Sequence, residues 1–154
     1  MAEKKESKFD KDLKYGNIFE NQVHNVLVNS KIEMKCERDR WMDTKNVFIE
    51  YECYGKPSGV CKESTKSAYW IHGLDLGDNH IHGAFLFKVS RLQKIVEKYK
   101  KTHTRNGGDG YRAKGIVISI SKLLSETINI DTDKEDRWPE WKSISDSGQD
   151  VETN

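Results

Sequence analysis

Two short segments, residues 31–39 (KIEMKCERD) and residues 47–53 (VFIEYEC), decide the fold that we expect of this chain. Both alternate apolar and polar residues with a period of two, which is typical of half-buried β-strands. A polar stretch, residues 40–46, joins them, so we predict an antiparallel hairpin. The register that puts both apolar faces on one side pairs Glu37 with Glu50 and Lys35 with Glu52.

The polar face of this predicted hairpin collects carboxylates around a lysine. Carboxylates crowded on one sheet face repel each other unless a cation offsets their charge. Two interpretations stay open. The face is either the solvated side of an exposed hairpin, where cross-strand Lys–Glu pairs are common, or a divalent-metal site for phosphodiester hydrolysis. Its members are Glu33, Lys35, Glu37, Asp39, Glu50 and Glu52.

The segment before the hairpin predicts an amphipathic helix from about Asp10 to Asn29, because its apolar residues recur with helical spacing. Glu20 lies at the border of the apolar stripe, since Val23 and Leu27 follow it at i+3 and i+7. A carboxylate in that position costs desolvation energy unless it is paired or binds a cation. A structural ion pair and a metal ligand both remain open for Glu20.

Residues 54–59 (YGKPSG) follow the second acidic strand directly. The glycines and the proline end the strand, and the turn would present Lys56, Ser58 and backbone N–H groups beside the carboxylates. Such a turn suits a phosphate next to a scissile bond, although an ordinary loop has the same composition.

Charge is distributed unevenly along the 154 residues, whose formal net charge is +1. Residues 131–154 hold eight acidic and three basic residues, which leaves a net charge of +6 on residues 1–130. Basic residues gather around a glycine-rich segment, residues 102–114, and would attract a phosphate backbone or simply favour solubility. They are Lys94, Lys98, Lys100, Lys101, Arg105, Arg112 and Lys114.

Taken together, Glu20 and residues 32–39, 46–52 and 55–59 resemble the core of small phage-type PD-(D/E)XK nucleases, over about Lys8 to Leu74. The resemblance implies a single α/β domain with an αβββαβ restriction-endonuclease-like core around a central mixed sheet. It also implies Mg²⁺ dependence, with Mn²⁺ as a substitute, and endo- or exonucleolytic hydrolysis of DNA phosphodiester bonds. It implies little about which DNA structure is cut, and branched or replicating phage DNA is one option that stays open. The metal ligands it implies are Glu20, Glu50 and either Glu37 or Asp39.

The acid-x-Lys motif of that family corresponds to residues 50–52 (EYE), with Glu52 at the lysine position. Three solutions stay open. Glu52 itself serves at this position, Lys35 brings its ammonium from the neighbouring strand, or residues 33–35 (EMK), which begin with Glu33, are the motif. The predicted cross-strand register favours Lys35. Either Lys35 or Glu52 would then orient or deprotonate the attacking water.

DNA is the partner that the resemblance implies, and related enzymes often act as homodimers. Two other functions remain open: a catalytically weak or inactive nucleic-acid-binding module derived from a nuclease, and a small interaction protein that uses its acidic tail. In the nuclease interpretation, Lys56 and Ser58 hold a flanking phosphate. The wider DNA contacts are assigned to Lys101, Arg105, Arg112 and Lys114.

The rest of the chain is typical of one core domain, residues 1–130, followed by an acidic and partly disordered tail, residues 131–154, with Trp138 and Trp141. Alternating or apolar runs predict strands at 68–74, 81–87 and 115–120. Helices are expected after Ser90 and after Ser121 as N-caps. Residues 102–114 are expected to be a mobile loop.

Cysteine and histidine patterns add expectations about environment. Cys36 and Cys53 fall on apolar faces and should be buried, and no CxxC pair, signal peptide or membrane-spanning stretch is present in the sequence. A reducing cytoplasm follows, that of a host cell if the chain is phage-encoded, with no membrane partner. His80 and His82 share one strand face, and we interpret them as surface or core histidines instead of metal ligands.

Overall fold

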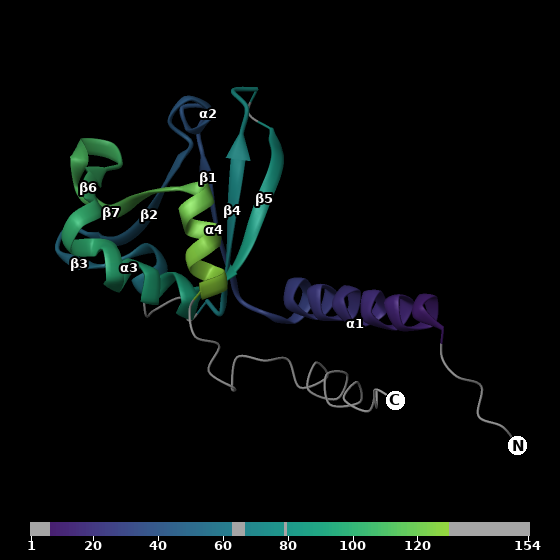
Figure 1. Cartoon of the computed structure of the whole chain (residues 1–154). Coiled ribbons are helices and arrows are strands. Elements are labelled where there is room, and N and C mark those ends of the chain that lie inside the picture. Colours follow the sequence, from purple (N-terminus) through teal and green to yellow (C-terminus); the bar gives the residue numbers. More distant parts are fainter. Residues whose placement is uncertain (1–6, 63–66, 79, 130–154) are drawn as a thin grey trace, which may run out of the picture. The chain divides into compact units, whose positions relative to one another are not determined.

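The computed structural model describes residues 7–62, 67–78 and 80–129, which fall into two compact units (Figure 1). One unit holds helix α1 (Lys8–Asn29) as far as Val28, and the other begins at Asn29 and holds the strands and the remaining helices. The predicted α/β class is confirmed. Residues 131–154, with the predicted acidic tail, lie outside the described residues.

Helix α1 confirms the predicted helix and begins with a capping box. The backbone N–H of Ser7 donates to Asp10 Oδ2 at 2.9 Å, and the backbone N–H of Asp10 donates to Ser7 Oγ at 3.2 Å. The hydroxyl of Ser7 also donates to Asp10 Oδ2, at 2.7 Å, and this hydrogen bond, followed by the one from the Ser7 backbone N–H, lowers the pKa of Asp10. The predicted burial is not found: Val26 is the buried residue of α1, while Phe19 and Glu20 are exposed. Helical spacing predicts an apolar stripe, but it does not say which surface covers that stripe.

The described strands form two sheets, which we call sheet A and sheet B (Figure 1). In sheet A the order is β1–β4–β5, with β1 parallel and β5 antiparallel to β4. In sheet B the order is β3–β2–β7–β6, and every pair is antiparallel. Sheet A consists of β1 (Ile32–Glu37), β4 (Tyr69–Asp75) and β5 (Ile81–Lys88); sheet B consists of β2 (Asn46–Cys53), β3 (Lys56–Pro57), β6 (Thr104–Gly107) and β7 (Ala113–Ser119).

The predicted hairpin between β1 and β2 is wrong. Lys35 of β1 lies opposite His72 of β4, and Glu50 of β2 lies opposite Gly115 of β7. The short helix α2 (Trp41–Thr44) separates the two strands along the chain. The physical reason lies in burial: β7 offers β2 an apolar partner face, with Ile49 opposite Ile116, and both side chains are fully buried. The polar face of β1 offers β2 no apolar side chains to bury in this way.

Helix α3 (Val89–His103) packs its apolar face into the main core together with sheet B. The predicted buried residues Leu92, Ile95 and Val96 are confirmed. Helix α4 (Ile120–Asn129) adds Leu123 to the same core. This core covers the face of β2 and β7 that carries Val47, Ile49, Ile116 and Ile118, so the opposite face of sheet B is left for other contacts.

Both predicted N-caps are displaced by two residues. Lys88, the last residue of β5, caps α3 in place of Ser90. Ser119, the last residue of β7, accepts the backbone N–H of Lys122 at 3.2 Å in place of Ser121. Each helix starts directly from the end of a strand, so the cap position is set by where the sheet ends and not by the best capping residue nearby.

The expected mobile loop at residues 102–114 is also wrong. Helix α3 continues to His103, strand β6 follows, and a short 3-10 helix, η3 (Asp109–Tyr111), leads into β7. The glycines of this segment favour a loop in the sequence, but at residue 107 glycine is needed for packing. A Cβ at this position would lie 3.0 Å from Cζ of Phe48, so glycine leaves room for the Phe48 ring beside β6.

No helix among the described residues is long and apolar enough to cross a membrane. The strands predicted at 68–74, 81–87 and 115–120 correspond to β4, β5 and β7 and are confirmed.

Candidate active site between the two sheets

The polar face of β1 turns toward the interior, opposite to the prediction. Glu33 lies beside Trp70 and Lys35 beside His72 in the parallel register, and the two β4 side chains are each only 1% exposed. The predicted apolar residues Met34 and Cys36 are exposed instead. The expectation that Cys36 is buried is therefore wrong, because alternation alone does not say which face of an edge strand meets the core.

This inversion forms a pocket of about 480 Å³ between the two sheets. Its walls combine the inner face of sheet A, the face of β2 that is turned away from the main core, and the start of the segment after β6. The lining residues are Lys35, Cys36, Glu37, Arg38, Arg40, Phe48, Glu50, Trp70, His72, Gly107 and Gly108. Glu37 and Glu50 thus both line one pocket, from two different sheets.

Glu37 is held at its Oε1 atom from two directions. The backbone N–H of Phe48 donates to this oxygen at 2.6 Å, and Nε2 of His72 lies 3.2 Å from it. The indole N–H of Trp70 donates to His72 Nδ1 at 3.2 Å, so a neutral His72 carries its proton on Nε2 and presents it toward Glu37. The Nε2–Oε1 approach is off the hydrogen-bond axis, and Nε2 is a buried atom without a hydrogen bond among the described residues.

Glu50 is held by the segment that follows β2. The hydroxyl of Ser58 donates to Glu50 Oε1 at 2.5 Å, and the Ser58 backbone N–H donates to the carbonyl of Tyr51 at 3.0 Å. The chain reverses between β2 and β3 through Tyr54 and Gly55, both with positive φ. Gly59 then approaches β2 so closely that a Cβ there would lie 2.2 Å from the carbonyl oxygen of Glu50. The GKPSG segment therefore places a hydrogen-bond donor on the carboxylate.

The predicted neighbours Lys35 and Glu52 do not meet. Lys35 lies 3.4 Å from Glu33 on its own strand, and Glu52 pairs at 2.7 Å with Lys114, which lies opposite it on β7. The hydrogen bond and charge of Glu52 raise the pKa of Lys114. The cross-strand argument failed because it rested on the incorrect hairpin, yet Lys35 still lines the pocket.

Asp39, one of the two alternatives for the third metal ligand, lies outside the pocket. It is exposed beyond the end of β1, close to Gly77, and is not among the pocket residues. Glu20 lies on α1, in the other compact unit, so its role remains a prediction. Within residues 7–62, 67–78 and 80–129, no group of three or more His, Cys, Asp or Glu side chains is placed to hold a metal ion.

The predicted DNA-contacting residues are exposed, apart from Ser58, which is partly buried against Glu50. They lie on β3, at the end of α3, on β6 and around the start of β7, and are Lys56, Lys101, Arg105, Arg112 and Lys114. Sequence reasoning missed Arg38, Arg40 and His72, which line the pocket. For His72 a signal existed, because this histidine interrupts the apolar run of the strand predicted at residues 68–74.

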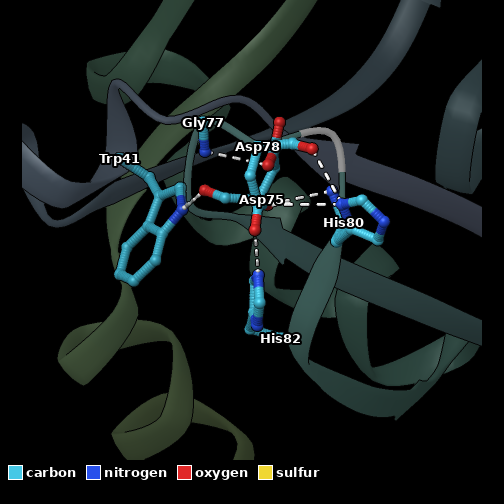
Figure 2. A network of polar contacts seen from close by, with 6 residues as sticks. All are labelled: Trp41, Asp75, Gly77, Asp78, His80 and His82. Atoms are coloured by element: carbon cyan, nitrogen blue, oxygen red, sulfur yellow. Dashed lines mark hydrogen bonds and ion pairs between the residues drawn. The ribbon is translucent and has the colours of Figure 1, made fainter.

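The turn between β4 and β5 holds a separate polar network, which Figure 2 shows. The indole N–H of Trp41 donates to the carbonyl of Asp75 at 2.6 Å. Asp78 lies 2.7 Å from Nε2 of His82 and accepts the backbone N–H of His80 at 3.0 Å. His80 and His82 are exposed, as expected for surface histidines.

This network predicts a pH-dependent signal at the turn. The hydrogen bond from His82 is the largest cause that lowers the pKa of Asp78 below its ordinary 3.8. The contribution of the ionised Asp78 carboxylate to stability is therefore present above the ordinary pKa of this group and lost as the pH falls through its lowered pKa. We expect His82→Ala to raise the pKa of the Asp78 carboxyl, measured by carbon NMR titration, and His24→Ala on α1 to leave it unchanged. An Asp78 pKa that does not move in His82→Ala contradicts this assignment.

No protein-family model matches the chain, and no curated protein or solved structure matches it either. The function of the pocket is therefore argued from its own geometry.

Proposed function

We propose that this chain is a metal-dependent nuclease that hydrolyses DNA phosphodiester bonds in the pocket between sheets A and B. The observation that carries the proposal is that Glu37 and Glu50 line one pocket together with Lys35, Arg38 and Arg40. Carboxylates beside cationic side chains suit a phosphate that is bound through a divalent ion. The finer fold assignment, a restriction-endonuclease-like core of phage type, belongs to the same proposal.

The donor set fits Mg²⁺ better than a metal that needs a full protein cage. Mg²⁺ usually keeps several waters and is held by one or two carboxylates plus substrate phosphate oxygens. Glu37 and Glu50 supply two such carboxylates. The absence of a three-residue cluster among the described residues is compatible with this mode of binding. Mg²⁺ held there would polarise the scissile phosphate and lower the pKa of a water molecule bound to the ion.

The protein's own contribution is to orient these groups before DNA arrives. The backbone N–H of Phe48 fixes Oε1 of Glu37, which also lies 3.2 Å from His72 Nε2, and the hydroxyl of Ser58 fixes Oε1 of Glu50. Side chains held in this way lose little additional conformational freedom when the substrate binds. Lys35, which is about half exposed at the pocket, orients the attacking water or stabilises charge on the phosphate.

The basic residues at the pocket act on the DNA backbone. Arg38 and Arg40 are exposed and lie where the chain leaves β1. Their guanidinium groups would contact phosphates beside the scissile bond, which positions DNA without reading its sequence. Such contacts predict an affinity that falls steeply with salt concentration.

A DNA-binding module without catalysis is the second candidate, and one observation favours it. The position that carries lysine in the family motif holds Glu52, and this carboxylate is paired with Lys114. A site whose acid-x-Lys position is filled by an ion-paired glutamate keeps the fold and the basic surface but lacks that cationic group.

One incubation separates the two candidates. Branched, flapped, duplex and single-stranded DNA are each incubated with Mg²⁺, with Mn²⁺ and with EDTA, and the products are resolved on denaturing gels. We expect cleavage of at least one substrate with either metal and none with EDTA. DNA that is bound but never cut selects the binding module, and cleavage that persists undiminished in EDTA contradicts the metal requirement.

A further inference from the structure

Two tyrosines at one end of sheet B are exposed on a strained backbone. Tyr54 and Tyr111 are 66% and 75% exposed, and their φ angles are +52° and +56°. For a residue with a Cβ this left-handed region is sterically unfavourable, and neither ring gains burial in return. Strain at exposed aromatic residues is more typical of a binding surface than of a structural position.

An arginine connects the first tyrosine to the segment that carries the second. The Arg112 guanidinium carbon lies 5.1 Å from the centre of the Tyr54 ring, and its Nη1 donates to the Tyr54 hydroxyl at 2.5 Å. The Tyr54 backbone N–H donates to the carbonyl of Arg112 at 3.2 Å. Tyr111 precedes Arg112 directly. We call Tyr54, Lys56, Tyr111 and Arg112 the tyrosine–arginine cluster.

The cluster carries positive charge and reaches the pocket through its own segment. Lys56 and Arg112 are both exposed. The backbone N–H of Tyr111 donates to the carbonyl of Gly108 at 3.2 Å, and Gly108 lines the pocket. The segment that carries Tyr111 and Arg112 therefore adjoins the wall of the pocket that Gly108 forms.

We infer that the cluster binds a single strand of nucleic acid, with Tyr54 and Tyr111 stacked on unpaired bases and Arg112 and Lys56 on the flanking phosphates. Stacking on an aromatic side chain needs a free base face, which a duplex hides and a single strand offers. Basic residues alone would bind duplex and single-stranded nucleic acid alike. The two exposed tyrosine rings therefore favour a strand with unpaired bases. The idea that a strand bound at the cluster continues into the pocket rests on the proposed function. The stacking of bases on the two tyrosines does not rest on it.

The test measures affinity in EDTA, so that no strand is cut. Fluorescence anisotropy with a labelled oligothymidylate, an oligouridylate and a duplex of equal length gives the dissociation constants over a series of salt concentrations. We expect both single strands to bind more tightly than the duplex. Tyr54→Leu and Tyr111→Leu should each weaken single-strand binding about tenfold at an unchanged salt slope. Arg112→Ala should reduce the slope by about 0.7. Tyr15→Leu on α1 is the matched control and should bind as the native chain does.

Glycine variants separate binding from folding. Tyr54→Gly and Tyr111→Gly remove the ring and also relieve the left-handed strain, so we expect the thermal unfolding midpoint not to fall while single-strand affinity drops. Native affinity in the leucine variants, or equal affinity for duplex and single strand, overturns the inference. If only the oligothymidylate is bound, the surface is specific for DNA, and the inference holds for single-stranded DNA.

The outcome is independent of catalysis. Single-strand binding that depends on the tyrosines, in a chain that cuts nothing with Mg²⁺, supports this inference and overturns the nuclease proposal. Cleavage with Mg²⁺ by a chain whose leucine variants keep the native single-strand affinity has the reverse meaning.

Discussion

Replacing Glu50 by glutamine is expected to lower the rate of Mg²⁺-dependent DNA cleavage by about a hundredfold or more. The amide keeps the size of the side chain and can still accept the hydrogen bond from Ser58, but it removes one of the two anionic ligands in the pocket. Loss of such a ligand costs several kcal/mol of transition-state stabilisation, and each ~1.4 kcal/mol is tenfold in rate. The measurement is kcat/KM on the best substrate from the panel.

A matched variant on the surface controls for unspecific effects. Glu97 lies on α3, is well exposed, and pairs with Lys100 at 2.7 Å. Glu97→Gln makes the same chemical change outside the pocket and should keep the native rate. We also expect Glu50→Gln to bind DNA in EDTA at least as tightly as the native chain, because a negative charge next to the phosphates is gone. A Glu50→Gln chain that cuts at the native rate removes the basis for the nuclease proposal.

Replacing Gly59 by alanine is expected to lower the free energy of unfolding by about 3 kcal/mol or more. A Cβ at this position would lie 2.2 Å from the carbonyl oxygen and 2.7 Å from the carbonyl carbon of Glu50, and the φ angle of Gly59 is +52°. The clash is with backbone atoms of a central strand, so no side chain can rotate away to relieve it. Since domains of this size are stable by roughly 5–15 kcal/mol, the variant should unfold at clearly lower urea concentration.

Gly55 provides the control in the same segment. Its φ angle is +72°, yet nothing lies within 4 Å of a Cβ built there. Gly55→Ala therefore meets only the left-handed backbone cost, about 1 kcal/mol. The two variants should differ by about 2 kcal/mol in urea denaturation. Equal losses would show that backbone conformation, and not the close approach to β2, requires glycine at residue 59.

Much of the local structure could be predicted because it depends on residues close together in the sequence. The helical spacing before residue 30 produced α1, and the apolar positions Leu92, Ile95 and Val96 produced the buried face of α3. Glu37 and Glu50 also line one pocket. The prediction that they lie together rested on a hairpin that does not form, and the two side chains reach the pocket from different sheets.

The rest of the candidate site could not be predicted in this way. His72 orients toward Glu37 only because β4 lies beside β1 in a parallel pair, and the partner of Glu52 is Lys114 only because β7 lies beside β2. These pairings join segments far apart along the chain. They are selected by how much apolar surface they bury together, which no single segment records.

By itself, the sequence determined where most helices and strands lie, and it showed that two strands carry acidic residues and that basic residues gather farther along the chain. Periodicity and charge could be used in this way because both are properties of neighbouring residues. Only the tertiary structure decided that β1 and β2 belong to different sheets and that the polar face of β1 points inward. A period of two is the same for both faces of a strand, so the face that becomes interior is chosen by the partner strand and by the core that forms around it.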